Sequence, residues 1–68
     1  MKMTRFAVQR CIGNTIEVLG MYESKEEMLR ALELLKEKYA GQPGVINGVS
    51  GELDKKGYNP PGKMCRLY

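Results

Sequence analysis

Histidine and tryptophan are absent from this 68-residue chain, and cysteine occurs only twice. Because histidine is the most common general base near neutral pH, its absence excludes the Ser-His and Cys-His arrangements of nucleophilic enzymes, and it removes the most common metal ligand. No Walker or GxGxxG phosphate-binding pattern is present either. We therefore expect a protein that is not an enzyme and that holds no cofactor or metal.

Long hydrophobic runs are absent as well. No apolar segment approaches the roughly 20 residues that span a bilayer, and the first residues, MKMTRF, lack the apolar core of a secretory signal peptide. Two cysteines are too few for a disulfide scaffold, which favours a cytoplasmic protein with reduced thiols. A single domain of residues 1–68 hides only about 60% of its unfolded surface, so we expect a homo-oligomer to supply further stability.

The clearest local signal is a helix from Ser24 to Ala40. Ser24 and Glu27 have the spacing of a capping box, while Gly41 and Pro43 are typical of a helix end. Between these limits the apolar residues recur at helical spacing on one face: Met28, Leu32, Leu35 and Tyr39. This face is expected to pack against the rest of the protein.

Residues 4–22 predict a β-hairpin that turns at Gly13-Asn14. Two registers are open. A two-residue loop places Arg10 opposite Glu17 and mixes apolar with polar side chains on both faces. A three-residue loop that begins at Ile12, with Asn14 left-handed, groups apolar residues on one face: Phe6, Val8, Ile16 and Val18. Because burial should select the cleaner pattern, we favour the second register. It leaves a smaller group on the face away from the helix: Ala7, Cys11, Leu19 and Met21.

Residues 44–53 alternate between apolar and other side chains and predict a third strand. Three glycines weaken that strand and suggest a bulge or a close approach of another segment: Gly44, Gly48 and Gly51. Asn47-Gly48 has an alternative interpretation as a tight hairpin turn.

The remaining residues complete the predicted fold. Asp54–Gly57 fits a type I turn, residues 59–62 (NPPG) prevent regular strand pairing, and residues 63–68 predict a last strand. The predicted class is α+β with the order ββαββ: one amphipathic helix packed on a mostly antiparallel sheet of about four strands. The order of the strands within the sheet stays open.

Two weak chemical signals have simpler structural explanations. Cys11 and Cys65 each lie beside an arginine, which would favour a reactive thiolate, but small half-buried strand residues explain them equally. Glu52 and Asp54 are spaced to point the same way from a strand and could share a proton or a cation. Two carboxylates are too few for a calcium site, and we interpret them as solvated residues at a strand end.

One helix covers only one face of a sheet, so we expect the other face to be an uncovered apolar surface. The favoured hypothesis is a binding protein that acts through protein–protein contacts, by self-association as a homodimer or by occlusion of a partner's surface. The predicted apolar contacts are Leu19, Met21, Ile46, Met64 and Tyr68, with Arg5 and Arg66 at the rim. In size and layout the chain is similar in style to accessory proteins of phages and mobile elements, including anti-CRISPR inhibitors, although no residue motif carries that comparison.

The alternative function is nucleic-acid binding through a basic surface. The formal net charge is +3, and much of the positive charge lies in the two β-rich arms. The candidate residues combine cations with tyrosine rings for stacking: Arg10, Lys55, Lys56, Tyr58, Lys63 and Arg66, together with Tyr68. Salt separates the two hypotheses, because affinity for nucleic acid falls steeply as salt rises whereas an apolar interface barely responds.

Overall fold

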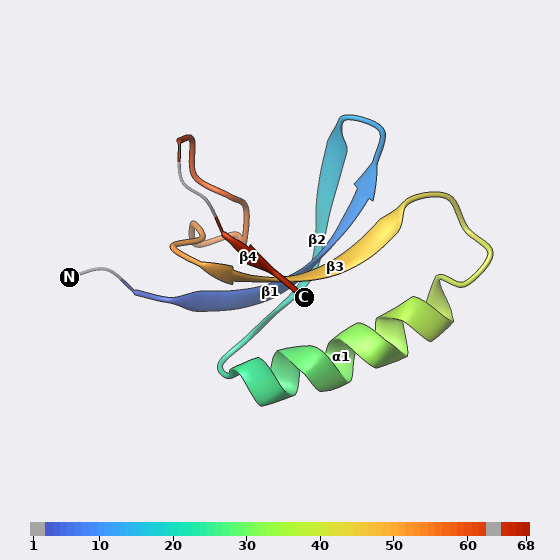
Figure 1. Ribbon diagram of the computed structural model, residues 1–68, viewed down its shortest axis with the longest axis horizontal. Coiled ribbons are helices and arrows are strands. Elements are labelled where there is room, and N and C mark those ends of the chain that lie inside the picture. Colours follow the sequence, from blue (N-terminus) through green and yellow to red (C-terminus); the bar gives the residue numbers. More distant parts are fainter. Residues whose placement is uncertain (1–2, 63–64) are drawn as a thin grey trace.

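The computed structural model describes residues 3–62 and 65–68. Four antiparallel strands form one sheet in the order β2-β1-β3-β4, and the single helix packs on one face of it (Figure 1). The elements follow the chain as β1 (Arg5–Ile12), β2 (Thr15–Tyr22), α1 (Lys25–Lys38), β3 (Val45–Gly51) and β4 (Arg66–Leu67). The predicted α+β class and the ββαββ order are confirmed.

Helix α1 begins where the capping signal predicts. The Ser24 hydroxyl accepts a hydrogen bond from the Glu27 backbone N–H at 3.2 Å, and the Glu27 carboxylate accepts one from the N–H of Glu23 at 3.3 Å. The helix ends at Lys38, two residues before the predicted end, with Tyr39 as its C-cap. Its apolar face packs on the sheet, as the spacing of the apolar residues predicts. Met28 and Leu32 on this face are buried, and Leu35 is partly buried.

The favoured hairpin register is wrong, and the two-residue loop is the one that forms. Ile12 pairs with Thr15 across Gly13-Asn14, which places Arg10 opposite Glu17. Gly13 has a φ of 58°, whereas Asn14 is not left-handed. Glycine at the first central position is the requirement of a type II′ turn, whose twist matches the two strands. This local preference outweighs the cleaner burial pattern of the other register.

A β-bulge in β2 lets apolar side chains of this strand pack on both faces of the sheet, although the two-residue loop mixes apolar with polar residues on each face. Gln9 pairs with Val18 but Val8 pairs with Gly20, so Leu19 is the extra residue. The insertion changes the alternation of β2, and Val18 and Leu19 pack in clusters on opposite faces of the sheet. Neither uniform register considered from the sequence contains this step.

Strand β3 runs through Asn47-Gly48 without turning, so the alternative interpretation of these residues as a hairpin turn is wrong. Gly48 lies directly beneath the helix. A side chain on Gly48 would collide with the Met28 sulfur and would lie 3.3 Å from the Leu32 Cδ2 atom. The predicted close approach is therefore confirmed at Gly48, where the absence of a Cβ lets the helix and the sheet touch.

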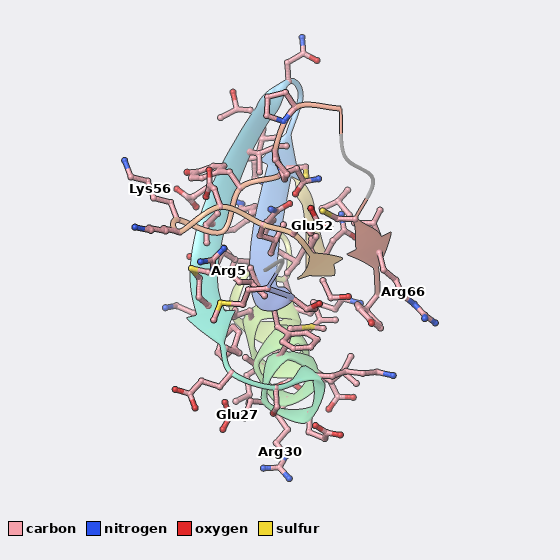
Figure 2. All side chains as sticks on the ribbon, turned by 90° about the vertical axis from the view of Figure 1, so that its left-hand side faces the viewer. Arg5, Glu27, Arg30, Glu52, Lys56 and Arg66 are labelled. Atoms are coloured by element: carbon pink, nitrogen blue, oxygen red, sulfur yellow. The ribbon has the colours of Figure 1, made fainter. Side chains whose placement is uncertain are left out.

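Hydrophobic residues gather on both faces of the sheet. On the helix side, Val8 is buried with Met28 and Leu32. On the other side, which we call the outer face, Ala7 and Val49 are buried with Leu53. Leu53 belongs to residues 52–62, which we call the covering loop. This loop lies above β1 and β3 in Figure 1, opposite the helix, and passes in front of β1 and β2 in Figure 2.

The covering loop is fastened to the outer face by hydrogen bonds as well as by Leu53. The buried Gln9 amide donates to the Gly57 carbonyl at 2.7 Å and to the Asn59 side-chain oxygen at 3.0 Å. The Arg5 guanidinium donates to the Leu53 carbonyl at 2.7 Å. The expectation of an uncovered outer face is therefore wrong for the half that the loop occupies. Since prolines bar this segment from pairing as a strand, it crosses the face as a loop and buries its one leucine there.

Candidate protein-binding surface

The residues predicted from the sequence as an apolar interface do not form one surface. Leu19, Ile46 and Tyr68 pack in the helix-side cluster, and the Tyr68 hydroxyl is hydrogen-bonded to that of Ser50 at 3.1 Å. Their assignment to the outer face is wrong, because the bulge redirects Leu19 and because Ile46 pairs with Arg10 on the helix side.

The other predicted contacts are dispersed. Met21 does lie on the outer face and is partly exposed beside Gly57, whereas Met64 lies outside the described residues. Of the predicted rim, Arg5 is bound to the covering loop and Arg66 lies over the Tyr68 ring at 5.4 Å.

The cations predicted for nucleic-acid binding are also separated in space. Arg10 lies on the helix side, 4.9 Å from the centre of the Tyr39 ring, and donates to the Pro43 carbonyl at 2.9 Å. Lys55, Lys56 and Tyr58 are exposed on the covering loop, and Lys63 lies outside the described residues. Figure 2 shows Lys56 and Arg66 on opposite sides of the molecule. Within residues 3–62 and 65–68, this set therefore forms no continuous basic face.

The carboxylate of Asp54 is explained by the turn that it closes. It accepts hydrogen bonds from the backbone N–H groups of Tyr58 at 3.0 Å and Lys56 at 2.8 Å. The hydrogen bond from Tyr58 is the main cause that lowers the pKa of Asp54 below its usual value, and the N–H of Lys56 adds to it. Such a carboxylate holds the loop together as an ion and is poorly suited to carry a proton.

The two thiols lie at opposite ends of the sheet. Cys11 pairs with Val45 at the start of β3, and Cys65 lies against Gly51 at its end. These positions on β3 are six residues apart, which corresponds to about 20 Å along a strand. That separation rules out a bond between Cys11 and Cys65 within one molecule. Among the residues that the structure describes, no three histidine, cysteine, aspartate or glutamate side chains gather as a metal site.

A surface that the sequence analysis did not assemble lies at the hairpin end of the outer face. Cys11 pairs directly with Ile16 on one side and with Val45 on the other, so the three side chains form one row across β2, β1 and β3. Ile16 is 41% exposed and Val45 is 59% exposed, while Cys11 is half-buried between them. We call these three residues the outer row.

The outer row is exposed although the covering loop lies on the same face of the sheet. The covering loop is anchored at Gln9, two residues before Cys11, and helix α1 packs on the opposite face. In Figure 1 the hairpin tip extends away from helix α1, and the covering loop rises to the left of the hairpin. The charged neighbours along these strands, Arg10 and Glu17, project from the helix side. The row itself therefore presents only apolar groups, which is the composition of the centre of a protein interface.

The adjacent sheet edge is less suited to binding. Strand β2 is an edge strand, and its backbone could in principle pair with another chain. The bulge at Leu19 interrupts regular pairing after the first half of the strand, and Glu17 places a charge in that half. Both features are common protections of an edge against pairing. Side-chain contact through the outer row is thus favoured over strand addition.

The signal for the outer row was present in the sequence. A two-residue loop with glycine in first position places Cys11 opposite Ile16, and the alternation of residues 44–53 exposes Val45 on one side of its strand. The favoured three-residue loop instead turned Ile16 toward the helix, which hid the row. Its position beyond the covering loop depends on tertiary structure.

No family model, curated protein or solved structure matches this chain. None of the described helices is long and apolar enough to cross a membrane. Among the described residues, the outer row is the feature that best supports a function.

Proposed function

We propose that this protein is a non-enzymatic binding protein that acts through protein–protein contacts, with the outer row at the centre of the contact. The observation that carries the proposal is the alignment of three uncharged residues across three adjacent strands, with Ile16 and Val45 exposed on either side of the half-buried Cys11. Isolated exposed apolar residues are normal on soluble proteins, but a contiguous apolar row is typical of an interaction site.

The expected gain from covering the row is substantial for so small a protein. Full burial of a valine or isoleucine side chain contributes about 1.5–3 kcal/mol, and about half of each side chain is already buried in Ile16 and Val45. Covering both therefore adds about 2 kcal/mol in total, before any surrounding contacts are counted. Contacts of this size contribute to specific association when further residues around them are also buried.

Site-specific photo-crosslinking tests the proposal. A benzophenone amino acid would replace Val45, and in a matched control it would replace Leu34, which is 67% exposed on α1. We expect a discrete protein adduct from position 45 in the cells that make the protein, none from position 34, and loss of the adduct when Ile16→Glu is added to the same chain.

Three results would contradict the proposal: no adduct from position 45, the same adducts from both positions, or an adduct that persists with Ile16→Glu. An adduct that nuclease digests, and whose formation from the purified protein falls steeply when irradiation is carried out at higher salt, would instead support the nucleic-acid alternative, since phosphate contacts weaken steeply with salt.

A further inference from the structure

Resting on the proposed function, we propose that the occupant of the outer row is a second copy of this chain, packed face to face about a two-fold axis close to Cys11. Most soluble oligomers are symmetric, and a two-fold interface requires a surface that is complementary to itself. The outer row meets this requirement. With the axis over Cys11 and parallel to the row, Ile16 lies opposite the partner's Ile16 and Val45 lies opposite the partner's Val45.

The outer row carries no charge that would oppose a second copy. Each chain carries a formal net charge of +3, so two copies repel one another wherever their cations meet. The outer row is uncharged, and its charged neighbours Arg10 and Glu17 project from the opposite face of the sheet. Contact at the outer row itself therefore brings no charged side chains together, while the exposed cations of this face, Lys55 and Lys56, lie on the covering loop.

The exposed area also fits a dimer. The molecule exposes 4963 Å², whereas a compact monomer of 7.7 kDa exposes about 4300 Å². It is flat, with extents of 40 × 27 × 16 Å. The excess of about 600 Å² approaches the roughly 800 Å² that each partner contributes to an interface of standard size. This surplus belongs to the whole flat molecule, and it is of the order of the area that one partner of a dimer buries.

Sheet-on-sheet packing gives the arrangement a geometric signature. Two sheets packed face to face lie about 10 Å apart, so the two Cys11 residues would face one another across the axis. Their Cα atoms would be too far apart for a direct disulfide, which needs less than about 7 Å. A short bismaleimide would nevertheless join the two Cys11 sulfurs in a Cys65→Ser variant. The corresponding Cys11→Ser variant, whose remaining thiol lies at the other end of the sheet, should give far less crosslinked product.

The test is sedimentation equilibrium over a wide concentration range with the purified full chain. We expect the wild type to form dimers that persist at high salt. Val45→Glu, which places two carboxylates in the symmetric contact, should raise the dimer dissociation constant at least about 100-fold. Leu34→Glu, a matched change at an exposed residue of α1, should leave it within about twofold. Circular dichroism confirms that the variants are folded, as expected for exposed positions.

If the wild type is monomeric at every concentration, the proposal that a second copy of the chain binds the outer row is wrong. A dimer that Val45→Glu leaves intact, or that Leu34→Glu dissociates, assigns the contact to another surface and overturns it too. These failures are distinguishable from failure of the proposed function. If the photo-crosslinked adduct from position 45 has a discrete mass other than twice that of the chain, the protein-binding function stands and the dimer does not.

Discussion

Gln9 holds the covering loop through two hydrogen bonds, and replacing it should loosen that loop. Gln9 is only 3% exposed, and its amide donates to the Gly57 carbonyl and to the Asn59 side chain. Gln9→Ala removes two hydrogen bonds, each contributing about 1 kcal/mol, and leaves the carbonyl of the buried Gly57 without that donor, at a cost of about 1–3 kcal/mol. We expect a total loss of at least about 3 kcal/mol.

That loss is large for this protein. A stability of 0.05–0.15 kcal/mol per residue corresponds to about 3–10 kcal/mol for the chain, so Gln9→Ala removes a third of it or more. In urea, with a slope of about 1 kcal/mol per molar, the unfolding midpoint should fall by about 3 M, or the variant should not fold. Asn59→Ala is the matched control, because it removes one of the two bonds at an exposed residue and should lower the free energy of unfolding by less than about 1 kcal/mol.

A second substitution at the same position sharpens the test. In Gln9→Glu a carboxylate faces the Gly57 carbonyl, so that two acceptors meet and neither can donate. Burial and this contact raise the pKa of the new carboxyl in the folded state above its unfolded value. Its stability should therefore be restored as the pH falls through the folded pKa, because the protonated group can donate to Gly57. Equal midpoints for wild type and Gln9→Ala, or a Gln9→Glu variant indifferent to pH, would refute this account of the loop.

Three further predictions concern other parts of the fold. Gly48→Val should lower the free energy of unfolding by about 3 kcal/mol in urea titrations, because its side chain collides with Met28 and Leu32, whereas the neighbouring Asn47→Ala should lower it by less than about 1 kcal/mol. Asp54 stabilises the fold as an ion, so this stability is present above the usual carboxyl pKa of 3.8 and is lost as the pH falls through the lower folded value. The free energy of unfolding of the wild type should accordingly fall more than that of Asp54→Asn below that pH, and parallel curves would contradict the role of the turn. Mild oxidation of dilute protein should leave both thiols free by mass spectrometry, since Cys11 and Cys65 lie at opposite ends of the sheet, and an intramolecular disulfide would contradict the sheet register.

The helix was predictable because its signals are local. Ser24 and Glu27 are three residues apart, and the hydrogen bond between them depends on little beyond the first turn. The same holds for the turn at Asp54, whose side chain bonds to backbone two and four residues later. Such features follow from short stretches of sequence, whatever the rest of the chain does.

The hairpin was predicted only in part, because its register depends on two competing effects. Gly13 favours the type II′ turn, while uniform burial favours the other loop. The protein satisfies both by inserting Leu19 as a bulge, a compromise that alternation over a single strand does not reveal.

The outer face was not predictable from local patterns. Leu53 and Gln9 lie more than 40 residues apart in the sequence, and neither alone indicates that a proline-containing loop will cross the sheet. The position of the candidate site follows from this loop, because Cys11 and its neighbours remain open only beyond its anchor at Gln9. Sequence reasoning therefore predicted an apolar binding surface, but three of the residues that it chose, Leu19, Ile46 and Tyr68, pack in the helix-side cluster.

The most direct test of the central claim is an isotope-filtered NOE experiment on a mixture of labelled and unlabelled chains. A dimer packed through the outer row predicts intermolecular NOEs at the methyl groups of Ile16 and Val45 and none at Leu34. Intermolecular NOEs confined to Leu34, or none at Ile16 and Val45 at concentrations where the mass is that of a dimer, would contradict it.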